Sequence, residues 1–105
     1  MPQAEVVIRE VLRIKSQSTL AHFYLGRVLT QENKFDEAEK ELLSSLNNED
    51  PQTFEAHRML ADMYLKKGDQ AAAVKRLETY LKLVPKAPDA DKLRHLITQL
   101  KQTKT

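Results

Sequence analysis

Apolar residues recur at intervals of three and four along most of the chain, which is the spacing of one face of an α-helix. Six such stretches follow one another, and they cover residues 3–15, 19–32, 35–47, 52–67, 70–84 and 88–102. No segment alternates between apolar and polar residues in the way a half-buried strand does. The pattern therefore predicts an all-α protein.

Residues that stop or start helices stand between these stretches. Asn33 and Gly68 follow the second and fourth stretches, and both residue types adopt the left-handed backbone that ends a helix. Asp50 precedes Pro51, and Asp69 precedes the fifth stretch, where an aspartate can accept hydrogen bonds from free backbone N–H groups. The short turns at Asn33 and Gly68 predict two antiparallel helix hairpins, with one further helix at each end.

The chain also repeats itself at a spacing of 35 residues. His22, Leu25, Gly26, Ala38 and Leu42 recur as His57, Leu60, Ala61, Ala73 and Leu77. A period of this length is typical of stacked arrays whose units bury themselves against their neighbours. Because stacked arrays present extended surfaces to partners, the period favours a binding scaffold over a catalyst.

The repeated residues resemble the tetratricopeptide repeat, in which a Leu-Gly pair is followed by an aromatic residue and later by an alanine. Residues 33–38 (Asn-Lys-Phe-Asp-Glu-Ala) and 68–73 (Gly-Asp-Gln-Ala-Ala-Ala) are similar to that family's turn and second-helix start. The resemblance covers about residues 3–85 and implies antiparallel helix hairpins stacked as a short right-handed α-solenoid. It divides a single 1–105 domain into the second helix of a partial repeat (1–17), two repeats (18–51 and 52–85) and a capping helix (86–105).

Composition and charge exclude several function classes. The chain has 17 basic and 15 acidic residues, and a net charge of +2 is too small an excess to indicate a nucleic-acid partner. It has no Cys, which excludes disulfides and thiolate chemistry. No run approaches the roughly 18 apolar residues of a membrane span, and the N-terminus lacks the pattern of a secretory signal. We therefore expect a cytoplasmic location by default.

The histidines at 22, 57 and 95 could suggest a metal site. His22 and His57 share the repeat register, and the resemblance places each of them between the two helices of one repeat. Equivalent positions in neighbouring repeats lie on the order of 10 Å apart, which is too far to share one ion. Because the chain also has no phosphate-binding loop and no recognisable set of catalytic residues, we expect no metal, no cofactor and no enzyme activity.

The resemblance implies a concave groove, lined by the first helix of each repeat, that receives a peptide or a segment of another protein. We expect this groove to be lined by Leu20, Phe23, Tyr24, Arg27, Gln31, Glu55, Arg58, Met59, Asp62 and Lys66. Leu20, Tyr24 and Met59 could equally pack against neighbouring helices.

Four other groove candidates are harder to explain as core, namely Phe23, Arg27, Arg58 and Asp62. Aromatic and arginine residues are enriched where binding energy is concentrated. Members of the family that bind chaperones carry Asn where Arg27 and Asp62 stand, and use it to clamp a terminal carboxylate. A ligand of mixed charge with an apolar anchor fits this chain better than an acidic tail does.

The first stretch favours a second hypothesis, which is self-assembly. It is apolar over a wide arc, because Val6 and Leu12 join the apolar residues of its main face. A helix of this kind needs burial on two sides. Its missing partner could be further residues of a longer protein or a second copy of the chain, giving a homodimer through Val7, Ile8, Val11 and Ile14.

Overall fold

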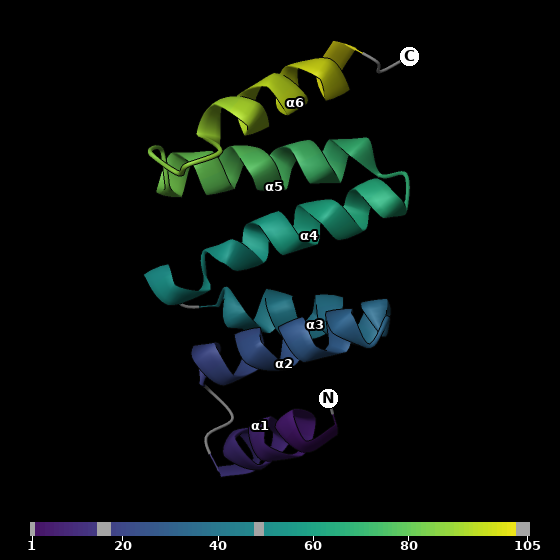
Figure 1. The fold of residues 1–105 in the computed structure, drawn as a ribbon, viewed down its shortest axis with the longest axis vertical. Helices are drawn as coiled ribbons and strands as arrows, with labels where there is room; N and C mark the ends of the chain where they lie inside the picture. The colour runs from purple at the N-terminus through teal and green to yellow at the C-terminus, as the bar shows by residue number, and fades with distance from the viewer. Residues whose placement is uncertain (1, 15–17, 48–49, 103–105) are drawn as a thin grey trace. The chain divides into compact units, whose positions relative to one another are not determined.

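The computed structural model describes residues 2–14, 18–47 and 50–102, and the regular structure in these ranges is entirely helical (Figure 1). The helices are α1 (Pro2–Ile14), α2 (Thr19–Gln31), α3 (Phe35–Ser45), α4 (Glu55–Lys66), α5 (Gln70–Leu83) and α6 (Ala90–Gln102), and a 3-10 turn η1 (Pro51–Thr53) precedes α4. The predicted all-α class is confirmed. The chain divides into two compact units, residues 1–56 and 57–105.

The two predicted left-handed turns are present. The backbone φ is 63° at Asn33 and 83° at Gly68, and each residue follows a helix that ends two positions earlier. Asp69 caps α5 as expected, since its side chain accepts a hydrogen bond of 3.1 Å from the N–H of Ala72. These turns make α2–α3 and α4–α5 antiparallel hairpins (Figure 1).

The fourth helix begins later than the sequence pattern predicts. Asp50 does act as a cap, because its side chain accepts a hydrogen bond of 3.0 Å from the N–H of Gln52. The N–H and the hydroxyl of Thr53 both donate to the carbonyl oxygen of Asp50, at 2.8 Å and 2.9 Å. These bonds close a tight 3-10 turn, so the α-helix starts only at Glu55.

The first unit is held together by a close approach between α2 and α3. Gly26 on α2 and Leu42 on α3 are both buried, and a Cβ added at Gly26 would lie 2.6 Å from Cδ2 of Leu42. Only a residue without a side chain leaves room for this contact. The small residue that the repeat places at position 26 therefore serves the packing of α2 against α3.

The core of the second unit joins α5 to α6. Its buried residues include Leu77, Leu81, Leu93 and Ile97, and Tyr64 and Leu100 pack at its edge. The other side of α6 carries the exposed polar residues Asp91, Lys92, Arg94, His95, Thr98 and Gln99. A helix with one apolar stripe and a polar outer face has the properties of a cap.

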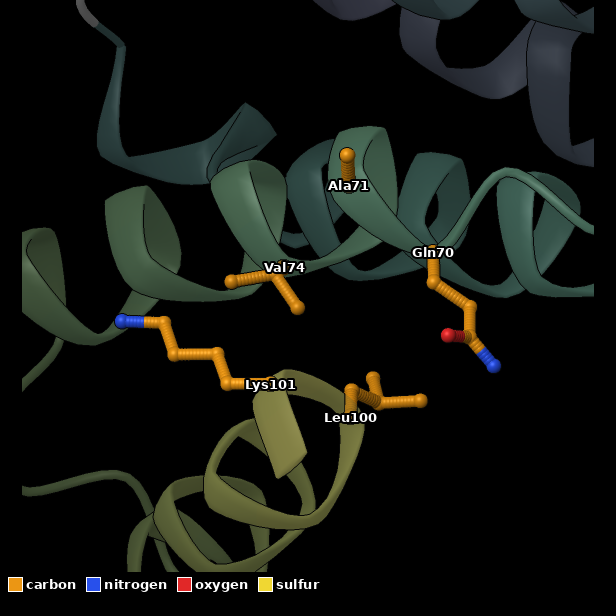
Figure 2. Close-up of a pocket in the computed structure, with 5 residues that line it drawn as sticks. All are labelled: Gln70, Ala71, Val74, Leu100 and Lys101. Carbon is orange, nitrogen blue, oxygen red and sulfur yellow. The ribbon is translucent and has the colours of Figure 1, made fainter. Parts of the chain in front are cut away.

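An open groove of about 250 Å³ remains between α5 and the last turn of α6 (Figure 2). Its lining residues are Gln70, Ala71, Val74, Leu100 and Lys101. The ammonium group of Lys101 lies 2.6 Å from a carboxylate oxygen of Glu78, so its charge is already paired. The sequence pattern did not predict this groove.

Candidate functional site

A second open groove, of about 240 Å³, lies in the first unit between α1 and α2. It is lined by Ala4, Ile8, Tyr24, Arg27, Val28 and Gln31. Tyr24, Arg27 and Gln31 were predicted as partner-binding residues, and their spacing of three and four positions places them on one face of α2. The structure therefore brings together three of the predicted residues and adds an apolar wall from α1.

The apolar wall is the part of the site that the sequence interpretation missed. Ala4 and Ile8 come from α1, and Val28 follows Tyr24 by one helical turn. Ile8 was expected on the dimer face, but it is half-buried beside α2. Helical spacing could have indicated this wall, since Ala4 and Ile8 are four residues apart and therefore lie on one face of α1.

Arg27 is the cationic group of this groove, and it lies close to two aromatic rings. Its Cζ atom lies 5.9 Å from the ring centroids of both Phe23 and Tyr24. Those rings are themselves 5.7 Å apart and tilted by 56°. A guanidinium at this distance from an aromatic face is stabilised by a cation–π interaction. Within the described residues Arg27 forms no ion pair, so its charge is available to a ligand.

Phe23 corrects one expectation. We considered it hard to explain as a core residue, yet only 5% of it is exposed, whereas 43% of the neighbouring Tyr24 is exposed. Phe23 packs its ring against Tyr24 and supports the guanidinium of Arg27. Its burial makes it a support for the groove rather than a surface that a ligand can contact.

Arg58, another predicted groove residue, makes contacts inside the second unit. Its guanidinium lies 2.7 Å from a carboxylate oxygen of Asp89 and 5.6 Å from the ring centroid of Tyr80. These contacts join α4 to α5 and to the residue that precedes α6, all within the second unit. The guanidinium of Arg58 is therefore paired within the second unit, and its role in binding stays a prediction.

The remaining predicted groove residues differ in exposure. Glu55, Asp62 and Lys66 are exposed on α4, whereas Leu20 on α2 and Met59 on α4 are half-buried. No contact in the structure tests their role in binding, and they stay predictions.

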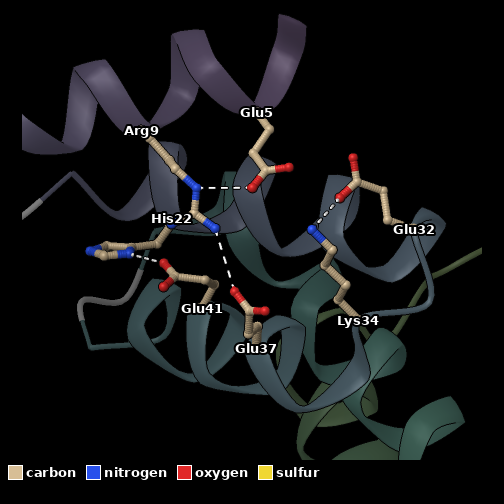
Figure 3. A network of polar contacts seen from close by, with 7 residues as sticks. All are labelled: Glu5, Arg9, His22, Glu32, Lys34, Glu37 and Glu41. Atoms are coloured by element: carbon tan, nitrogen blue, oxygen red, sulfur yellow. Dashed lines mark hydrogen bonds and ion pairs between the residues drawn. The ribbon is translucent and has the colours of Figure 1, made fainter. Parts of the chain in front are cut away.

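A network of charged side chains crosses the first unit beside the groove (Figure 3). Arg9 on α1 contacts Glu5 on the same helix at 3.0 Å and Glu37 on α3 at 3.5 Å. His22 on α2 contacts Glu41 on α3 through Nδ1 at 2.7 Å. Because these contacts connect α1, α2 and α3, they help to hold the helices that form the groove.

The repeat-related histidines lie between the two helices of their hairpins, as expected. Nδ1 of His57 lies 3.4 Å from a guanidinium nitrogen of Arg76, in the same register as the His22–Glu41 contact. Burial lowers the pKa of His57, and the charge of Arg76 lowers it further. Among the described residues, no three His, Cys, Asp or Glu side chains are grouped as a metal site would need.

Comparison with known proteins agrees with the fold. The family model described as tetratricopeptide repeat matches residues 25–91, which is more than half of the chain. A search of curated proteins found no match. In the part of the chain that the structure describes, none of the helices has both the length and the apolar character needed to cross a membrane.

Proposed function

Because the chain belongs to the tetratricopeptide repeat family, whose members generally take part in protein–protein interactions, we propose that it binds a peptide or a protein segment in the groove between α1 and α2. All-helical repeats of this family are typically non-catalytic scaffolds. The main support for the proposal is the state of Arg27. Its side chain is exposed, its Cζ lies 5.9 Å from two aromatic ring centroids, and it has no ion pair among the described residues.

The chemistry of the groove indicates what the ligand contains. A guanidinium presents five N–H donors in a planar fork that matches a carboxylate. Because the rings of Phe23 and Tyr24 already restrict Arg27, less side-chain entropy is lost when a ligand binds. The apolar wall of Ala4 and Ile8 can cover an aliphatic side chain. The ligand is therefore a segment with an apolar residue close to a carboxylate.

A displayed library of random peptides tests this proposal. We expect peptides selected on the wild-type chain to combine an acidic residue with a nearby aliphatic one. Arg27→Glu should weaken their binding by about tenfold or more, because it replaces the carboxylate's partner with a like charge. Tyr24→Ala should weaken binding through the loss of both stacking and apolar contact.

Lys40→Glu is the matched control, since Lys40 is an exposed cation on α3 and does not line the groove. It makes the same change in net charge as Arg27→Glu, so its binding should stay close to wild type. If selected peptides bind Arg27→Glu and Tyr24→Ala as tightly as the wild-type chain, the groove between α1 and α2 is not the binding site.

Independently of the groove between α1 and α2, the exposed charges of α4 stay proposed partner contacts. Glu55, Asp62 and Lys66 offer both signs of charge on one helix. Mixed charge of this kind favours a ligand that also carries both signs.

A further inference from the structure

The charges of the chain are divided unequally between its two units. The first unit, residues 1–56, has 6 basic and 10 acidic residues, whereas the second, residues 57–105, has 11 basic and 5 acidic residues. The formal net charges are therefore −4 and +6, and they largely cancel in the +2 of the whole chain. A unit with such an excess of one sign attracts partners of the opposite sign. The second unit therefore favours an anionic partner.

Most acidic side chains of the second unit are already used inside it. Three of the five form ion pairs there, and these pairs are Asp89–Arg58 at 2.7 Å, Asp91–Arg94 at 3.0 Å and Glu78–Lys101 at 2.6 Å. A fourth, Asp69, caps α5 by accepting a hydrogen bond from the N–H of Ala72. The acidic residues therefore neutralise a few particular cations and leave others of the unit unbalanced.

The unbalanced cations are lysines. Four exposed lysines of the second unit form no ion pair among the described residues, namely Lys75, Lys82, Lys86 and Lys92. Lys75 and Lys82, which we call the α5 lysines, are seven residues apart and therefore lie on one face of α5. Glu78 lies between them on this face, but its carboxylate is paired with Lys101 from α6. The face thus offers two free ammonium groups to a ligand.

We propose that the α5 lysines bind an extended acidic segment of another protein. A rise of 1.5 Å per residue places them about 10 Å apart along the helix. In the polyproline II conformation, residues three positions apart lie on the same side of the chain and about 9 Å from each other. Carboxylates with this spacing reach both lysines, and the flexible lysine stems accommodate the remaining difference. The segment therefore carries acidic residues three positions apart.

The same face fits a nucleic acid less well. Surfaces that bind single strands combine cations with aromatic rings on which the bases stack. The aromatic residues of the second unit are Tyr64 and Tyr80, and neither is exposed. A continuous row of phosphates would also pass the carboxylate of Glu78 between the two lysines. An acidic protein segment with neutral residues between its carboxylates avoids this repulsion.

This surface is separate from the groove between α1 and α2. The groove belongs to the first unit, and its cation is Arg27, whereas the α5 lysines belong to the second unit. Because the expected contacts with the α5 lysines are exposed ion pairs, they are weak one by one and sensitive to salt. The groove, in contrast, has an apolar wall from Ala4 and Ile8. The two surfaces therefore select different ligands.

Fluorescence anisotropy of the full chain tests the proposal. The probe is a labelled peptide made only of Glu, Ser and Gly, with Glu at every third position, so it has no apolar side chain for the groove. We expect it to bind, and we expect an increase in NaCl from about 50 to 300 mM to weaken binding by about fivefold or more. The same peptide with Gln in place of Glu should not bind.

Two neutralised lysines and a charge-matched control make the test specific. Lys75→Gln combined with Lys82→Gln should weaken binding of the Glu peptide by about threefold or more. Lys34→Gln combined with Lys40→Gln makes the same change in net charge at exposed positions of the first unit, and it should leave binding unchanged. Arg27→Glu, which also lowers the net charge by two, should have no effect on this peptide.

Three results would overturn the proposal. The first is a Glu peptide that does not bind at about 50 mM NaCl, where the charges are least screened. The second is a control variant that weakens binding as much as the loss of the α5 lysines does. The third is a single-stranded DNA of equal charge that binds more tightly than the peptide at about 150 mM NaCl. None of these results depends on the groove, so each proposal can fail without the other.

Discussion

The two repeat-related histidines occupy the same position of their hairpins but meet opposite charges. His22 contacts the carboxylate of Glu41, whereas His57 contacts the guanidinium of Arg76. Glu41 on α3 and Arg76 on α5 stand at equivalent positions of their hairpins. The charge beside the histidine ring therefore changes sign from the first hairpin to the second. His57 is buried, and this burial together with the charge of Arg76 lowers its pKa.

The lowered pKa of His57 predicts how stability depends on pH. The unfolded chain binds a proton near the ordinary histidine pKa of about 6.5, while the folded chain binds it only at lower pH. The unfolded state therefore holds more protons between these two values, and the free energy of unfolding falls as pH drops below about 6.5. Urea denaturation at about pH 7.5, 6.5 and 5.5 measures this loss.

His57→Gln is the comparison variant, because glutamine keeps a polar side chain that does not titrate. We expect the variant to lose less stability than the wild-type chain between about pH 7.5 and pH 5.5. Equal losses in the two proteins would show that His57 does not contribute to the pH dependence.

At this same scale, the sequence did not indicate contacts between side chains that are distant in the sequence. Arg58 was assigned to the groove, but it contacts Tyr80 and Asp89, which follow it by 22 and 31 residues. Phe23 was predicted to line the groove and is buried. Helical spacing shows which residues share a face, but it does not show what covers that face.

The turns that end α2 and α4 depend on local backbone chemistry. Asn33 and Gly68 stand at equivalent positions, and both have a positive φ. We expect Gly68→Asn to change the free energy of unfolding by less than about 0.5 kcal/mol, because asparagine tolerates this conformation. Gly68→Ala should cost about 1–2 kcal/mol, since its Cβ is strained there.

Urea denaturation of the two variants checks this prediction. A Cβ added at Gly68 meets no atom within 4 Å, so a difference between Asn and Ala there reports backbone conformation alone. Equal stability of the two variants would mean that the left-handed turn is not required.

The start of α4 shows the limit of local signals at the scale of elements. Asp50 and Pro51 correctly indicated a helix start, and Asp50 does cap. The bonds from Thr53 to Asp50 nevertheless tighten the first turn and delay the α-helix to Glu55. A capping signal indicates where a helical segment begins, but it does not distinguish a 3-10 turn from an α-helix.

At the scale of the whole molecule, the first and last helices differ in what they expose. α1 exposes Val6, Val7 and Val11, whereas α6 exposes polar side chains and places its apolar stripe in the core of the second unit. The apolar stripe of α6 should therefore carry much of the stability of the second unit.

Leu93→Ala tests this role of α6. Leu93 is buried in the core shared by α5 and α6, so we expect the variant to lose about 2–4 kcal/mol of unfolding free energy. Gln99→Ala, on the exposed side of the same helix, should change it by less than about 0.5 kcal/mol. Thermal and urea denaturation give both values, and a Leu93 variant as stable as wild type would show that α6 does not support the second unit.

The sequence by itself determined the helical class, the family and the left-handed turns at Asn33 and Gly68. These features depend on residues within one helical turn of each other or on a period that recurs along the chain, so they can be recognised without any tertiary contact. Only the tertiary structure decided that Arg27 is available while Arg58 is held by Asp89, and that Ile8 forms a groove wall while Val7 is exposed. The physical reason is that burial and charge pairing depend on side chains from other helices, and periodicity within one helix does not encode them.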